Sequence, residues 1–111
     1  MTLPELVRRQ AEIILQEYCA GRPGNRRGDQ KLAFEIVGEC ATLFAETEGS
    51  GAVRAEHSIA RFCYNHQLHQ WTLHYPDRSR EWRFYLNAGP TLNLGKLLHH
   101  VDEDPFGIFW P

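Results

Sequence analysis

The chain has 111 residues, a formal net charge of −2, and a high aromatic share with three Trp, four Tyr and six Phe. This length fits a single domain, residues 1–111, which can bury roughly two thirds of the surface of its unfolded chain. The near-neutral charge excludes a global attraction to nucleic acid or membrane, so any electrostatic role must come from a local patch.

The first predicted element is a helix that begins at a capping box. Thr2 and Glu5 have the spacing of that motif, and Pro4 occupies the first turn, where a missing N–H costs nothing. Gly21 and Pro23 end the helix. Its apolar stripe consists of Leu3, Val7, Ala11, Ile14 and Tyr18, flanked by Leu6 and Leu15.

A basic, glycine-rich loop follows, and from Leu32 the apolar residues recur with the period of two that is typical of strands. Gly38 and Glu39 predict a two-residue hairpin turn. Because the connections are short, we expect an antiparallel meander in which each strand pairs with the next. The five expected strands are Leu32–Val37, a segment through Leu43 to Glu46, His57–Tyr64, His69–Tyr75 and Glu81–Leu86.

A second helix is expected to begin at Asn93 and to end at Pro105. Its apolar face consists of Leu94, Leu97, Leu98 and Val101. The Asp-Pro-Phe-Gly sequence at 104–107 has the residue preferences of a type I turn. The turn returns the apolar tail, residues 108–110, to the core, although a dimer contact through the tail is the alternative. The predicted fold is α+β: helix, five-stranded antiparallel meander, helix, and a tail folded back on the core.

The second half of the chain carries a family resemblance. The segment "ARFCYNHQLHQWTLHYPDRSREWRFY", a Leu-rich helix and the C-terminal "DEDPFGIFW" together resemble the bacterial family called domain of unknown function 3024. The Asp-Pro-x-Gly-x-Phe-Trp signature at Asp104–Trp110 is the most specific part, and Trp71, Asp77, Arg78 and Trp82 also fit. The resemblance covers about Leu32 to Trp110. It implies the same fold boundaries and a bacterial, cytosolic setting, and it implies no activity.

The cysteines support the cytosolic setting. Cys19, Cys40 and Cys63 are odd in number and widely spaced, which favours reduced thiols over a disulfide framework. No basic segment followed by an apolar run opens the sequence, and no run approaches a membrane span. We therefore expect a cytoplasmic protein without a membrane partner.

The polar clusters give weak signals for metal binding or catalysis. Cys63, His66 and His69 surround one hairpin, and His57 or His74 is a candidate fourth zinc ligand. No paired zinc motif is present, so we expect exposed histidines, no metal and no cofactor. No nucleophile elbow, P-loop or HExxH sequence occurs, and no catalytic residue is assigned. The acids at 102–104 oppose the dipole of the second helix, which marks either function or a solvated helix end.

The better candidate for a site is one face of the sheet. Alternation assigns one face of the last three strands to the core, formed by Ala60, Phe62, Tyr64, Trp71, Leu73, Tyr75, Trp82, Phe84 and Leu86. The opposite face is then polar and suited to anions, because a guanidinium binds phosphate or carboxylate bidentately. The alternative is a solvated face whose arginines pair with glutamates. The predicted binding residues are Arg61, Thr72, His74, Arg83 and Tyr85.

These features favour a non-enzymatic binding module. Its expected partner is a protein or a phosphate-bearing ligand such as RNA, which contacts the polar sheet face. A small enzyme that uses His74 on this face is one alternative, and an oligomeric adaptor that acts through the aromatic tail is another.

Overall fold

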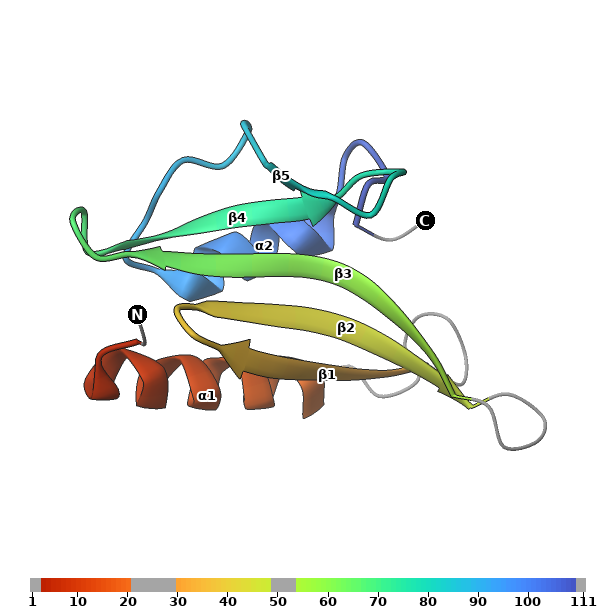
Figure 1. Ribbon diagram of the computed structural model, residues 1–111, viewed down its shortest axis with the longest axis horizontal. Helices are drawn as coiled ribbons and strands as arrows, with labels where there is room; N and C mark the ends of the chain where they lie inside the picture. The colour runs from red at the N-terminus through yellow and green to blue at the C-terminus, as the bar shows by residue number, and fades with distance from the viewer. Residues whose placement is uncertain (1–2, 21–29, 49–53, 110–111) are drawn as a thin grey trace.

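A computed structural model describes residues 3–20, 30–48 and 54–109 (Figure 1). The predicted α+β order is confirmed: along the chain, a helix is followed by the five strands of one sheet and then by a second helix. The predictions made for Thr2, for the helix end at Gly21 and Pro23 and for Trp110 lie outside the described residues. The elements are α1 Glu5–Ala20, β1 Gln30–Val37, β2 Cys40–Glu48, β3 Arg54–Asn65, β4 Gln70–Pro76, β5 Trp82–Phe84 and α2 Leu94–Glu103.

The sheet has the predicted meander topology, since its strands lie in the order β1-β2-β3-β4-β5 and all neighbours are antiparallel. Gly38 begins the β1–β2 turn with a φ of 62°, a backbone conformation that glycine adopts without steric cost. Most strand ends differ from the predicted ones by one or two residues, and two differences are more informative. β3 begins three residues earlier than expected, at Arg54, whereas β5 is only three residues long and ends at Phe84.

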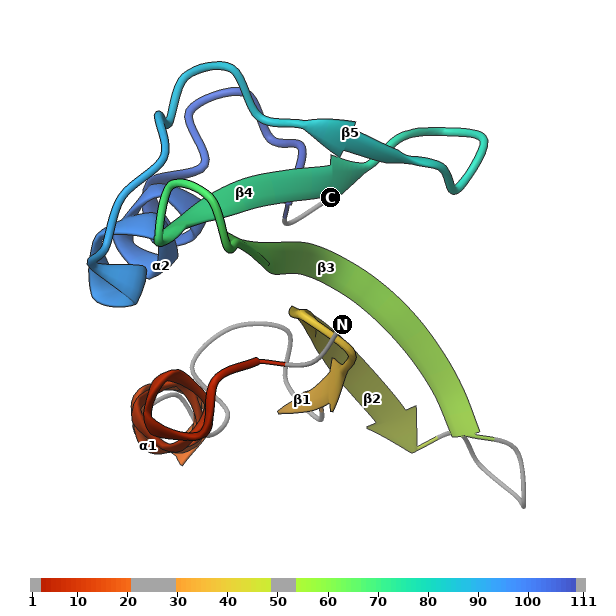
Figure 2. The ribbon, with the colours of Figure 1, turned by 60° about the vertical axis from the view of Figure 1, so that its left-hand side comes forward.

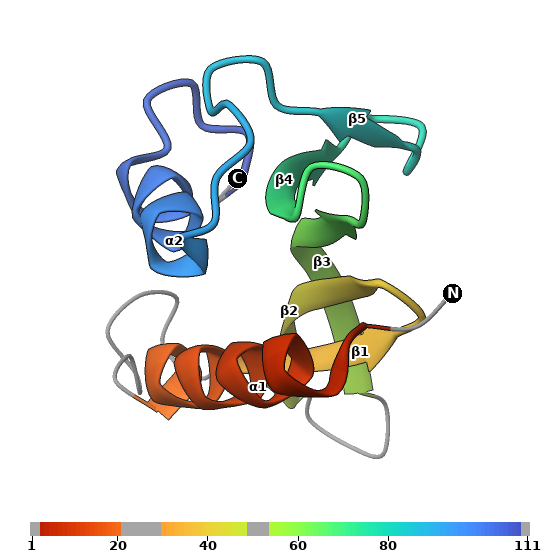
Figure 3. The same cartoon turned by 90° about the vertical axis from the view of Figure 1, so that its left-hand side faces the viewer.

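Both helices lie on the same side of the sheet (Figure 3). α1 packs beside β1, and α2 packs beside β4. The predicted stripes explain this arrangement: Ala11 and Leu15 of α1 are buried, as is the expected apolar face of α2. The Tyr18 hydroxyl joins the two helices by donating a 2.6 Å hydrogen bond to the Asp102 carboxylate. Among the described residues, neither helix has the length and apolar character that crossing a membrane requires.

The tail returns to the core as predicted. The Gly107 N–H donates to the Asp104 carbonyl across 3.1 Å and closes the turn, and the Asp104 carboxylate accepts hydrogen bonds from the N–H groups of Ile108 and Phe109. Phe109 is only 1% exposed and packs edge to face on Tyr85, with ring centroids 5.1 Å apart. The described part of the tail therefore closes the core beside α2 (Figure 2).

The expectation of reduced thiols is wrong for two of the three cysteines. Cys40 and Cys63 form a disulfide between β2 and β3, with their Cα atoms 4.1 Å apart. They face each other directly in the β2–β3 register, and the Tyr64 N–H bonds to the Glu39 carbonyl just outside the pair. This is the non-hydrogen-bonded kind of pair, in which side chains approach most closely. Counting cysteines and their spacing missed the bond because only the strand register brings the two together.

Candidate ligand-binding face of the sheet

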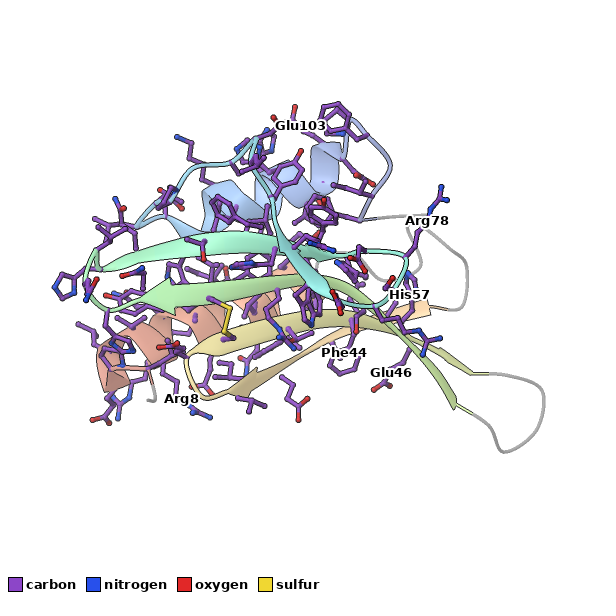
Figure 4. The ribbon with its side chains drawn as sticks, turned by 45° about the horizontal axis from the view of Figure 1, so that its top comes forward. Arg8, Phe44, Glu46, His57, Arg78 and Glu103 are labelled. Carbon is purple, nitrogen blue, oxygen red and sulfur yellow. A yellow bond between two sulfur atoms is a disulfide. The ribbon has the colours of Figure 1, made fainter. Side chains whose placement is uncertain are left out.

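The sheet has an outer face, which we define as the side turned away from α1 and α2. The register places Thr42, Arg61, His74 and Phe84 in one row across β2, β3, β4 and β5 on this face. The disulfide lies on the same side, nearer the viewer than the strands in Figure 4, where the helices are behind. None of the four row residues is buried, so the outer face is accessible to a ligand.

Three of the five predicted binding residues, Arg61, Thr72 and His74, do lie together on the outer face. The assignment of Tyr85 to this face is wrong. Tyr85 is 3% exposed in the core, and its N–H bonds to the carbonyl of Leu73, a core residue of β4. Arg83 pairs with Tyr75 in the register and also belongs to the side opposite the outer face, although its side chain is exposed.

The same correction brings two aromatic residues to the outer face. Trp82 and Phe84 were expected in the core, but Phe84 lies opposite His74 and is 41% exposed. The Arg61 guanidinium carbon lies 4.4 Å from the centre of the Trp82 ring, within the range of a cation–π contact. The rings of His74 and Phe84 are 5.7 Å apart. The outer face of β3–β5 is therefore both cationic and aromatic.

The β4–β5 turn explains why strand alternation assigned β5 to the wrong side. Five residues, 77–81, separate the paired Pro76 and Trp82. A turn with an odd number of residues pairs positions of equal parity, so even-numbered residues of β5 share a face with His74. A one-residue difference in register moves every side chain to the other face. The sequence feature that indicated this turn was Asp77, because Asp side chains accept hydrogen bonds from nearby N–H groups and so favour turns.

Hydrogen bonds hold Arg61 and His74 in position. Arg61 Nε donates to Thr42 Oγ1 across 3.1 Å. Thr72 Oγ1 donates to the Cys63 carbonyl and lies 2.9 Å from His74 Nε2. Because a hydroxyl has one hydrogen, Thr72 accepts from His74, which assigns the proton to Nε2 and leaves Nδ1 as an acceptor. Burial, and secondarily the charge of Arg61, lower the pKa of His74, so the ring is neutral at pH 7.

Asp77 organises the β4–β5 turn. Its Oδ1 accepts hydrogen bonds from the N–H groups of Ser79 and Glu81, at 2.8 and 2.9 Å, and its Oδ2 accepts from Arg83 Nε at 2.8 Å. The Arg83 hydrogen bond is the main reason that the pKa of Asp77 is lowered. Arg83 Nη2 also lies 3.8 Å from Glu81. The two acids of the turn are thus associated with the same arginine.

A hollow of about 380 Å³ lies between this turn, β3 and the tail. The β3–β4 pairing ends at Arg61 and His74, and β3 continues beyond it without β4. Ser58 of β3, Trp82 and Ile108 contribute walls, together with Arg78 and Arg80 from the turn. In Figure 4, His57 and Arg78 lie at this end of the sheet. His74 contributes no wall to the hollow.

Three of the side chains considered as metal ligands have neighbours of their own. Cys63 is in the disulfide, His66 Nε2 lies 3.2 Å from Glu39, and His69 Nδ1 lies 3.4 Å from the Tyr64 hydroxyl. No group of three or more His, Cys, Asp or Glu side chains within 3–20, 30–48 and 54–109 is arranged to hold a metal ion. Burial raises the pKa of the Cys19 thiol to about 11, so this cysteine is protonated and a poor nucleophile.

The acids at the end of α2 have structural contacts. Asp102 accepts from Tyr18, and Glu103 lies 3.3 Å from His99 one turn earlier. Asp104 is the C-cap in a left-handed conformation, with a φ of 35°. The acids were interpreted either as a functional site or as a solvated helix end, and these contacts support the second interpretation.

The comparisons with known proteins agree with the family resemblance and extend it. The model of the family described as "Domain of unknown function (DUF3024)" matches residues 3–111, including α1, which the resemblance had not covered. No curated protein and no solved structure matches the chain.

Proposed function

Because the chain belongs to the DUF3024 family, whose description names no activity, we propose a function from the outer face: a non-enzymatic module that binds single-stranded RNA. Bases stack on the aromatic side chains of β5, and Arg61 provides positive charge for the phosphates. A cytoplasmic location belongs to this proposal. The Cys40–Cys63 bond does not support this location, because the cytosol keeps most cysteines reduced.

The observation that carries the proposal is the shared position of Arg61, Trp82 and Phe84 on an accessible sheet face. Single strands are bound by aromatic side chains that stack on unpaired bases, together with cations that follow the backbone. The Arg61 guanidinium covers one side of the Trp82 ring, so Phe84 is the more accessible of the two aromatic rings of β5. Phe84 is thus the first stacking position, and Arg61 and Trp82 form the adjoining cationic one.

Hydrogen bonding on this face argues against Thr72 as a nucleophile that His74 activates. The Thr72 hydroxyl donates its hydrogen bond to the Cys63 carbonyl, so His74 does not act as a base toward this hydroxyl. The neutral His74 instead offers Nδ1 as an acceptor, suited to an N–H group of a base edge. The adaptor alternative loses support because Phe109 is part of the chain's own core.

Fluorescence anisotropy with a labelled single-stranded RNA of mixed sequence tests the proposal. Base–aromatic stacking contributes about 1–3 kcal/mol per base, so Phe84→Ser is expected to weaken binding by about fivefold or more. Phe106→Ser is the matched control, because Phe106 is 65% exposed on the tail turn, outside the sheet. Arg61→Gln should lower both the affinity and its dependence on salt, since fewer counterions are released.

The outcomes separate the candidate functions. Absence of RNA binding by the wild type, or equal weakening by Phe84→Ser and Phe106→Ser, contradicts the proposal. A cytosolic protein that is captured by the wild type but not by Phe84→Ser would instead favour a protein ligand on the same face.

A further inference from the structure

The hollow at the end of the sheet has an excess of positive charge. The turn 77–81 and Arg83 together contain two acids and three arginines. Arg83 contacts both acids, Asp77 at 2.8 Å and Glu81 at 3.8 Å. Within the described part of the chain, Arg78 and Arg80 form no ion pair. Their charge is therefore available to a ligand in the hollow that they line.

The backbone of the turn shows an unusual residue choice. Arg80 has a φ of 64°, in the left-handed region where side chains other than glycine are disfavoured. Its N–H donates to the Asp77 carbonyl across 2.9 Å, as Gly107 with the same φ donates to Asp104 in the tail. The tail uses glycine at this position, whereas the β4–β5 turn keeps an arginine despite the strain. Strained residues of this kind concentrate at functional sites.

The hollow adjoins the outer face, and Trp82 belongs to both. This residue lines the hollow and also receives the Arg61 guanidinium on its ring. On the far side, Ile108 of the tail limits the hollow. A strand that crosses the outer face therefore reaches the hollow at its end, where a volume of about 380 Å³ falls within the range of small-ligand sites.

We propose that this hollow binds the terminal phosphate monoester of the strand, held by Arg78 and Arg80 with the Ser58 hydroxyl as a further donor. The inference rests on the proposed function, because the rest of the strand lies on the outer face. A monoester carries a charge of about −1.5 to −2 at pH 7 and three acceptor oxygens, more than an internal diester has. Two unpaired guanidinium groups match that charge.

The test compares one RNA sequence in three forms: 5′-phosphorylated, 3′-phosphorylated and with hydroxyl groups at both ends. The wild type is expected to bind one phosphorylated form about tenfold more tightly than the hydroxyl form, because charge-assisted hydrogen bonds are strong. The form that is preferred identifies the end that enters the hollow. Equal affinity for all three forms overturns the inference while leaving RNA binding itself intact.

The double variant Arg78→Gln/Arg80→Gln should lose the preference and still bind the hydroxyl form. The matched control is Arg8→Gln/Lys96→Gln, which removes the same charge from the two helices and should keep the preference. A preference that persists in Arg78→Gln/Arg80→Gln also overturns the inference.

A second measurement is independent of RNA binding. Titration of a nucleoside monophosphate should shift the backbone NMR signals of Ser58, Arg78 and Arg80 in the wild type but not in the arginine double variant. If no RNA binds and these shifts still occur, the proposed function fails and the phosphate site stands. If the signals do not move, the phosphate site is contradicted.

Discussion

Two turns of this protein share one backbone design and serve opposite purposes. In each, an aspartate carbonyl accepts the N–H of the third residue beyond it, which has a φ of 64°, and the aspartate carboxylate accepts further N–H groups. The tail turn, residues 104–107, directs Phe109 into the core. The β4–β5 turn, residues 77–81, presents exposed arginines beside a hollow. The comparison shows that an Asp-centred turn fixes only the chain path, and that the following side chains decide between stability and binding.

Removing the Phe109 ring, which the tail turn directs into the core, should have the largest effect on stability. Phe109→Ala is expected to lower the free energy of unfolding by about 3–5 kcal/mol, because it removes a fully buried ring that packs on Tyr85. Urea denaturation followed by circular dichroism measures the change. Phe106→Ala, in the same turn but exposed, is the control and should change stability by less than about 0.5 kcal/mol. Equal midpoints for Phe109→Ala and the wild type would refute the role of the tail in the core.

The disulfide provides a reference outside both turns. Its cysteines are 23 residues apart, and a loop of that size predicts a loss of roughly 3 kcal/mol for Cys40→Ser/Cys63→Ser. The urea midpoint should fall in this variant and, equally, in the wild type with a dithiol reductant. The reductant should leave the double variant unchanged. An unaltered wild-type midpoint after complete reduction would contradict the predicted stabilisation.

Exchanging the residues with positive φ tests the comparison directly. Gly107→Ala should cost about 1–2 kcal/mol, since a side chain in the left-handed region is strained, while no atom lies within 4 Å of the added Cβ. Arg80→Gly should have the opposite and smaller effect, a gain below about 1 kcal/mol, because relief of strain is partly offset by backbone entropy. Thermal unfolding of both variants measures the difference. A loss of stability in Arg80→Gly would show that the arginine side chain stabilises the fold.

The smallest expected effect is the pH dependence of the β4–β5 turn. Hydrogen bonding to Arg83 lowers the pKa of Asp77 in the folded protein. The ionised Asp77 carboxylate therefore contributes its full stabilisation of the fold above the unfolded pKa near 3.8. The contribution is lost as the pH falls from that value through the folded pKa. Asp77→Asn should therefore be less stable than the wild type at pH 6, and the difference should shrink at acidic pH. A difference that is constant down to pH 2 would exclude the carboxylate as its cause.

The sequence predicted most of the fold but only part of the candidate site. Leu94, Leu97 and Val101 identified the buried face of α2, because a helix repeats every 3.6 residues whatever its surroundings. Arg61 and His74 were placed correctly, since β3 and β4 follow simple alternation through a short hairpin. Tyr85 and Phe84 were exchanged, because alternation alone does not give the length of the preceding turn.

The local patterns of the sequence thus determined the helices, the order of the strands and the return of the tail. These features depend on periodicity, on capping residues and on turn residues that act within a few positions. The tertiary structure alone decided the register across the β4–β5 turn, the Cys40–Cys63 pairing and the association of Arg83 with both acids of the turn. Each of these depends on which backbone positions of separate strands or turn residues meet in space, and a one-residue change in pairing would have given a different outer face.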